Sequence, residues 1–188
     1  GAWSEPRPPV AEIIDRKIDG PAGPLAVRIY RPDTTPRRPA MLYLHGGGWT
    51  FGSIETHDRI MRVLARESGV VVVGLDYRLA PEHPHPAGAD DTLAALDWLL
   101  AGGAGEGVDP TRLALGGDSA GANLALAALL VHGALFGSAL SLWHGIRDGA
   151  AGVPAIWRER RHALSSRTVA VSTIARALAW NPLHLLRR

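Results

Sequence analysis

Short, continuous apolar segments alternate with helix-like segments along the first 130 residues, and this alternation constrains the fold more than any other feature. The expected strands are 25–30, 40–44, 70–75 and 113–115, and the expected helices are 57–68, 90–100 and 120–130. Continuously apolar strands that are connected by helices form a parallel sheet with helices packed on both faces. The sequence therefore predicts an α/β fold with a mainly parallel sheet and flanking helices, with no linker inside this part.

Two of these segments carry predictions about which side chains are buried. In segment 25–30 the apolar side chains occupy alternate positions, which predicts a half-buried strand with Tyr30 on its other face. In segment 57–68, Ile60, Val63 and Leu64 fall on one helical face, and Gly69 is in position to end the helix.

Gly117-Asp118-Ser119-Ala120-Gly121 follows the last expected strand and opens the last expected helix. This is the structural context of a G-x-S-x-G nucleophile elbow. The glycines permit a sharp turn that pushes Ser119 out of the sheet. The start of the helix supplies free N–H groups and a positive dipole next to the serine. The motif therefore makes Ser119 the candidate nucleophile.

His45-Gly46-Gly47-Gly48-Trp49 directly follows expected strand 40–44. Three consecutive glycines leave the backbone N–H groups free to point at a ligand oxygen. This type of motif supplies the second part of an oxyanion hole in lipases and esterases. No lysine follows the glycines, which disfavours a phosphate-binding P-loop. We interpret His45 as an organiser of this loop.

Taken together, the two motifs resemble those of the hormone-sensitive-lipase-like (bacterial family IV) carboxylesterases of the α/β-hydrolase superfamily. The resemblance covers about residues 10–130. The further matching stretches are 76–82 (DYRLAPE), Pro86, Asp91, Trp98 and 108–110 with Arg112. The resemblance implies an α/β-hydrolase fold and hydrolysis of small carboxylic esters through an acyl-serine intermediate, with no cofactor and no metal.

The resemblance also implies a role for each motif residue. Ser119 is the expected nucleophile. Gly46, Gly47, Gly48 and Ala120 are the expected oxyanion-hole residues, with Gly46 supporting the loop that presents the other N–H groups. His45, Gly117, Asp118 and Gly121 are expected to support the two motifs. Asp76, Arg78 and Glu82 are expected to form a buried polar network.

Charge changes sharply near residue 130. Residues 1–130 carry 12 basic and 16 acidic side chains, a net of −4, whereas residues 131–188 carry 8 Arg and 2 acids, a net of +6. We expect residues 1–130 to be the N-terminal part of a hydrolase domain and 131–188 to be an Arg-rich segment unlike the family. A complete domain of this architecture commonly needs about 200–250 residues, so the sequence is expected to be truncated.

The catalytic acid and base have no convincing candidates. The superfamily order is Ser, then Asp or Glu, then His. By order alone, Asp148 or Glu159 is the candidate acid and His162 or His184 the candidate base, but none stands in the expected sequence context. The alternative hypothesis is therefore a catalytically inactive hydrolase-fold fragment or a binding protein.

Three further hypotheses concern the segment after residue 130. The first is that it arises from a shifted reading frame. The second is that it contributes to a membrane span in the uncharged stretch 120–146, and the third is that its arginines bind nucleic acid. Polar residues interrupt the uncharged stretch and the arginines are scattered, so the sequence predicts neither a membrane span nor a nucleic-acid partner.

Cysteine is absent from the sequence, which excludes disulfides, thiolate metal sites and a cysteine nucleophile. The first residues hold no apolar segment of signal-peptide length, so a cytoplasmic location is expected. The sequence leaves the oligomeric state open.

Overall fold

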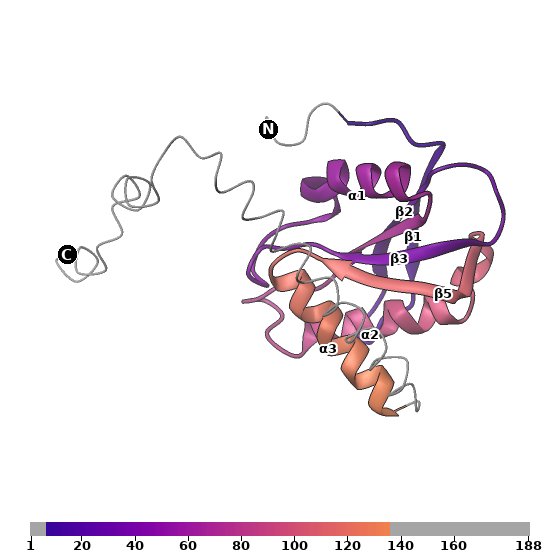
Figure 1. The fold of residues 1–188 in the computed structure, drawn as a ribbon. Coiled ribbons are helices and arrows are strands. Elements are labelled where there is room, and N and C mark those ends of the chain that lie inside the picture. Colours follow the sequence, from indigo (N-terminus) through magenta and orange to yellow (C-terminus); the bar gives the residue numbers. More distant parts are fainter. Residues whose placement is uncertain (1–6, 136–188) are drawn as a thin grey trace, which may run out of the picture. The chain divides into compact units, whose positions relative to one another are not determined.

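The computed structural model describes residues 7–135. They lie in the first of two units of the chain, Gly1–Ala139, and the second unit, Leu140–Arg188, is outside the described residues. The strands are β1 (Glu12–Ile18), β2 (Leu25–Arg31), β3 (Arg38–Leu44), β4 (Val71–Asp76) and β5 (Val108–Gly117). The helices are α1 (Ile54–Ser68), α2 (Ala87–Leu100), the short 3-10 helix Gly103–Gly105 and α3 (Ala120–Leu135) (Figure 1).

The five strands form one sheet in the order β1-β2-β4-β3-β5. β3 pairs in parallel with both β4 and β5, as the alternation of strands and helices predicts. β1 and β2 pair antiparallel, and β2 also runs antiparallel to β4. The chain between β1 and β2 is a short turn without a crossover helix, so it can connect only antiparallel strands. The α/β fold class is confirmed, and the described part of its sheet is mixed.

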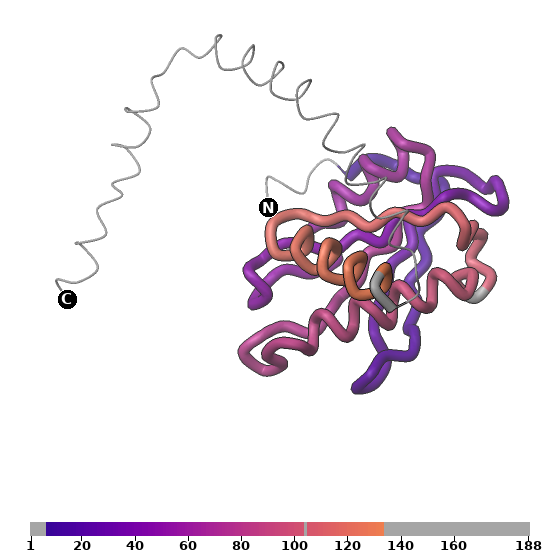
Figure 2. Tube along the Cα trace, turned by 60° about the horizontal axis from the view of Figure 1, so that its bottom comes forward, coloured from indigo at the N-terminus to yellow at the C-terminus, as the bar shows by residue number. Residues whose placement is uncertain are grey.

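Helices cover both faces of the sheet. α1 lies on one face, while α2 and α3 lie side by side on the other (Figures 1 and 2). Each face has its own apolar core. Ile29, Leu42 and Val73 belong to the cluster beneath α2 and α3, whereas Tyr30 and Val72 belong to the cluster beneath α1. Successive side chains of a strand point to opposite faces, so both faces of the central strands are buried.

β2 follows the expected alternation, with Leu25, Val27 and Ile29 buried and Ala26 exposed, but Tyr30 departs from it. Tyr30 is fully buried because α1 covers its face of the sheet. The Tyr30 hydroxyl donates to Asp58 on α1 at 3.0 Å. This hydrogen bond and burial raise the pKa of Tyr30 well above its usual value, with burial the larger cause.

The predicted apolar face of α1 is right for Leu64, which packs against the core, and wrong for Ile60. The helix buries Ile54, Met61 and Ala65, whereas Ile60 is exposed. Asp58 also lies on the buried face, paired with Tyr30 and with Arg62 on the next turn. These hydrogen bonds satisfy the Asp58 carboxylate, so a charged residue can occupy the inner face of the helix.

The ends of α1 follow local rules. Ser53 caps its N-terminus through a reciprocal pair of hydrogen bonds with Thr56, so the helix begins three residues before the predicted start. Gly69 adopts the left-handed conformation at φ 68° and ends the helix, as predicted.

No helix within residues 7–135 is long and apolar enough to cross a membrane. The part of the uncharged stretch 120–146 that follows α3 lies outside the described residues.

Candidate active site

Ser119 occupies the sharp turn between β5 and α3. Its φ is +50°, a left-handed conformation that non-glycine residues rarely adopt, and the residue is exposed. Gly117 and Gly121, on either side, lie against the carbonyl group of Leu44 at the end of β3. A β-carbon at Gly121 would collide with that carbonyl, so only glycine lets the turn pack this closely on the sheet. The turn therefore presents Ser119 at the carboxyl edge of the parallel strands.

The loop that follows β3 reaches the same edge of the sheet. Gly47 has a φ of +131°, and its carbonyl accepts from the amides of Thr50 and Phe51, each at 3.1 Å. A β-carbon at Gly47 would collide with the Phe51 carbonyl. Within residues 7–135, no protein group accepts a hydrogen bond from the amides of Gly47, Gly48 or Ala120. These three N–H groups are available to an external oxygen atom.

Asp118 fastens this loop to the serine turn. Its Oδ1 atom accepts from the Gly46 amide at 2.9 Å and from the Tyr43 hydroxyl at 3.0 Å. The Nε2 atom of His57, on the first turn of α1, lies 3.4 Å from the same oxygen. Burial, and then the bond to the Asp118 carboxylate, raise the pKa of Tyr43 well above its usual value. The end of β3, the loop after it and the first turn of α1 therefore meet at one carboxylate oxygen of the distant serine turn.

His45 lies beneath the loop and is 2% exposed. Its ring stacks on Tyr77 with 4.3 Å between the centroids, and its Nδ1 atom donates to the Gly46 carbonyl at 2.9 Å. The Tyr77 hydroxyl donates to the His45 carbonyl at 2.7 Å. Burial raises the pKa of Tyr77 to about 12 and lowers the pKa of His45. These contacts fit the expected role of His45 as an organiser of the loop.

The buried His45 is expected to make stability depend on pH. Because burial lowers the pKa of His45 from 6.5, the unfolded chain binds a proton more readily than the folded chain. The free energy of unfolding should be highest above about pH 6.5 and should fall as the pH drops below that value.

Urea unfolding of the wild type and of His45→Asn at about pH 7.5 and about pH 5.5 checks this expectation. Asparagine keeps a donor near the position of Nδ1 but does not titrate, so the variant should show a smaller loss of stability at the lower pH. The same loss in both proteins would contradict the role given to His45.

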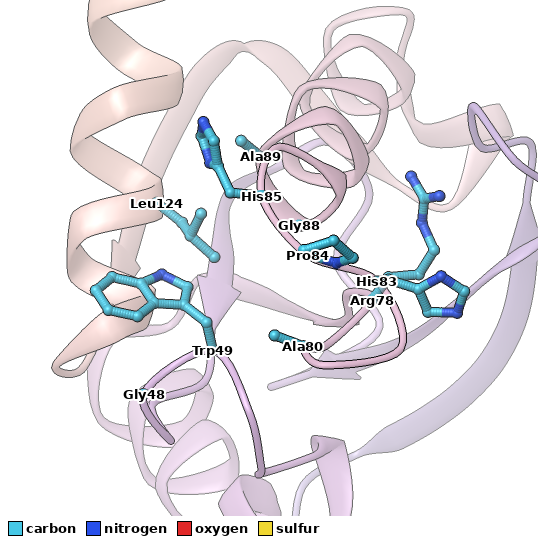
Figure 3. Close-up of a pocket in the computed structure, with 10 residues that line it drawn as sticks. All are labelled: Gly48, Trp49, Arg78, Ala80, His83, Pro84, His85, Gly88, Ala89 and Leu124. Atoms are coloured by element: carbon cyan, nitrogen blue, oxygen red, sulfur yellow. The ribbon is translucent and has the colours of Figure 1, made fainter.

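A cavity of about 380 Å³ opens beside Gly48. Its walls are mostly apolar and come from the loop after β3, the segment before α2, and α3 (Figure 3). Trp49, His85 and Leu124 lie on one side of the view, whereas the side chains of Arg78 and His83 extend away from Trp49 and Leu124 (Figure 3). The cavity has the size of a site for a small molecule.

The polar network predicted for the DYRLAPE segment is present in part. Arg78 forms a bidentate pair with the buried carboxylate of Asp91, and Asp76 accepts from the amide of Ile54 at the start of α1. Glu82 is exposed and makes no hydrogen bond or ion pair with another described residue, so the prediction that it belongs to the network is wrong. It lies in the loop between β4 and α2, where Pro81 and His83 are also exposed.

Other site expectations concern residues outside the described ones. Asp148, Glu159, His162 and His184, the candidate acids and bases, all lie beyond residue 135. The Ser119 hydroxyl makes no hydrogen bond within residues 7–135. The same part of the chain contains no group of three side chains able to hold a metal ion.

No role was assigned to Tyr43, Tyr77 or His57 from the sequence. Their contacts depend on α1, β3 and β4 being adjacent in space, which no local pattern encodes. Tyr43 does carry a signal, because a tyrosine two residues before the glycine loop places its hydroxyl near the edge of the sheet.

A model of the alpha/beta hydrolase fold family matches residues 41–169. The chain belongs to this family. The match includes both glycine motifs and extends past residue 130, where the charge balance changes. The resemblance of this chain to the hormone-sensitive-lipase-like esterases is also confirmed.

Relatives of this alpha/beta hydrolase are named as esterases. Esterase LipI of Mycobacterium tuberculosis is 46% identical over 124 residues, which cover 64% of the chain and 39% of the relative. Ethyl acetate hydrolase of Pseudomonas putida is 45% identical over 104 residues, which cover 54% of the chain and 33% of the relative. An esterase structure from Pyrobaculum calidifontis matches with a TM-score of 0.65 and 46% identity, over 66% of the chain and 41% of that protein. The chain thus spans about two fifths or less of these relatives.

Proposed function

We propose that this alpha/beta hydrolase chain carries the nucleophile and the oxyanion-binding groups of a carboxylic-ester hydrolase. The observation that carries the proposal is the strained, exposed backbone of Ser119, at φ +50°, beside a glycine loop with unused amides. Strain of this kind persists only where the surrounding structure maintains it, and it concentrates at functional sites. The names of the relatives as esterases agree with this chemistry.

In the proposed reaction, the Ser119 oxygen attacks the carbonyl carbon of the ester while its proton passes to a base. The carbonyl oxygen becomes negatively charged, and the N–H groups of Gly47, Gly48 and Ala120 stabilise it. Ala120 is the first residue of α3, so the positive end of that helix adds to the stabilisation. The tetrahedral intermediate then expels the alcohol, leaving an acyl-serine that water hydrolyses.

Gly46 supports this arrangement in a different way. Its amide donates to Asp118 and is not free for an oxyanion. We assign it to holding the loop in place, and Asp118 is its partner. His45 supports the same loop from beneath.

The cavity beside Gly48 indicates the size of the substrate. It is mostly apolar and about 380 Å³, which suits the apolar part of a small ester more than a long acyl chain. Trp49 and Leu124 form its apolar walls in Figure 3. We propose small-molecule esters as the substrate class.

The base and acid of the reaction lie outside residues 7–135 in this proposal, because no described group bonds to the Ser119 hydroxyl. A serine without a base keeps its ordinary weak nucleophilicity. This observation favours the second candidate function, a hydrolase-fold chain that binds small esters and does not turn them over.

Covalent labelling separates the two functions. The full chain is incubated with a p-nitrophenyl alkylphosphonate, and the adduct is located by peptide mass spectrometry. An adduct on Ser119 that forms faster than on free serine supports an activated nucleophile. An unlabelled protein, or labels spread over several hydroxyl groups, would favour the binding function.

A further inference from the structure

The contact between His57 and Asp118 connects α1 to the proposed oxyanion loop. Asp118 stands directly before Ser119, and its Oδ1 atom already holds Gly46, the first glycine of the loop. The His57 Nε2 atom lies 3.4 Å from that oxygen, and the imidazole ring is 5.5 Å from the ring of His45. A side chain of a third element is thus aimed at the carboxylate that joins the two motifs.

The other ring nitrogen of His57 is held by the cap of α1. Nδ1 lies 2.9 Å from the Thr56 hydroxyl and 3.3 Å from the Ser53 carbonyl. These contacts fix the orientation of the ring. The carboxylate of Asp118 can only accept a hydrogen bond. The contact between His57 and Asp118 is therefore attractive when Nε2 carries a proton, whether Nδ1 bonds to Thr56 or to Ser53.

We propose that His57 is a positioning residue that acts through Asp118 to hold the glycine loop against the serine turn. The expected effect on catalysis rests on the function proposed above, whereas the expected effect on the position of the loop does not. With its ring anchored to the helix cap, His57 restrains the Asp118 carboxylate, and Asp118 in turn restrains Gly46. The N–H groups of Gly47 and Gly48 depend on that restraint for their direction.

Burial sets the expected size of the effect. The side chain of His57 is 21% exposed and that of Asp118 is 49% exposed. Polar contacts this accessible to water contribute about a factor of five or less to an equilibrium. Loss of the contact should therefore loosen the loop and reduce kcat about threefold to fivefold, and it should not unfold the protein.

The first experiment measures the loop itself by hydrogen exchange of peptides that cover residues 45–52. The variants are His57→Leu, which removes both nitrogens, and His57→Gln, which restores a donor at a similar reach. Leucine and glutamine both favour helices, so α1 is preserved. Arg59→Gln is the control on the same helix, because Arg59 makes no hydrogen bond or ion pair with another described residue.

Exchange of the loop should be about threefold to fivefold faster in His57→Leu, and close to the wild-type rate in His57→Gln and Arg59→Gln. Peptides from the rest of α1 should be unchanged. Asp118→Asn tests the same contact from the other side, because asparagine keeps an acceptor for Tyr43 and Gly46 but has no charge. The double variant His57→Leu/Asp118→Asn should exchange no faster than the faster single variant.

The second experiment measures turnover of p-nitrophenyl acetate. If His57 positions the loop, kcat should fall in His57→Leu with little change in KM, and His57→Gln should restore it. Wild-type loop exchange in both His57→Leu and Asp118→Asn would overturn the proposal, as would effects that simply add in the double variant. Should the wild type show no Ser119-dependent turnover, the proposed function fails, and the exchange rates alone decide the role of His57.

Discussion

Ser119→Ala is expected to reduce turnover of p-nitrophenyl acetate and butyrate by about 10⁴-fold or more, to the background rate. The variant removes the atom that forms the acyl-enzyme, so no later step of the proposed reaction can proceed. The loss falls on kcat, because the cavity and the loop amides remain and still bind the ester.

This substitution isolates the chemistry from the fold. Alanine has the same β-carbon as serine, so the left-handed turn at φ +50° is equally strained in both proteins. The Ser119 hydroxyl makes no hydrogen bond within residues 7–135, and the residue is exposed. The free energy of unfolding should therefore change by less than about 0.5 kcal/mol.

The control is Ser68→Ala, which removes an exposed hydroxyl at the end of α1. It should retain full turnover. Initial rates of the two variants and the wild type, with urea unfolding curves for each, check the expectation. If Ser119→Ala and the wild type hydrolyse both esters at the same slow rate, this chain has no serine-dependent esterase activity, although its family membership stands.

The serine turn and the glycine loop were predictable because their requirements are local. Ser119 needs a left-handed backbone between a strand and a helix, and only glycine at Gly117 and Gly121 lets that turn lie on the end of β3. A five-residue motif between an expected strand and an expected helix was enough to predict this turn. The glycines after β3 show the same principle, because Gly47 adopts a φ that other residues rarely reach.

The buried face of α1 was predicted only in part, because one of its buried positions holds a charged residue. Asp58 occupies a buried position that the periodicity of hydrophobic residues assigns to an apolar side chain. Its partner Tyr30 lies on β2, 28 residues away in the sequence, and their hydrogen bond satisfies the carboxylate on the face that turns inward. Periodicity carries no information about such a pair, so the sequence predicts the helix but not its rotation.

The links between the motifs were also beyond local reasoning. The sequence shows that Asp118 supports the serine motif, but it does not show that Gly46, Tyr43 and His57 meet at its carboxylate. The meeting depends on β3 lying between β4 and β5, with α1 above them. A register shift of one residue in β3 would turn Tyr43 to the opposite face of the sheet.

Gly121→Ala is expected to destabilise the protein by about 3 kcal/mol, at the upper end of the cost of inserting a methyl group into a packed site. The new β-carbon would meet the Leu44 carbonyl, which is backbone and cannot change rotamer. Leu44 belongs to β3, which is hydrogen-bonded on both sides to β4 and β5, so the strand cannot move away. The penalty outweighs the roughly 1 kcal/mol by which alanine favours a helix over glycine.

Gly116→Ala is the matched control for Gly121→Ala, because Gly116 lies in β5 just before the serine motif. The three atoms nearest to its β-carbon would all belong to the flexible side chain of Met41, with the sulfur at 3.4 Å. The cost should stay below about 1 kcal/mol, whereas Gly121→Ala should lower Tm by about 10 °C. Thermal unfolding of the two variants and the wild type measures the difference. Equal Tm values for the two variants would show that the serine turn does not rest on the end of β3, and the proposed placement of Ser119 beside the loop amides would lose its structural basis.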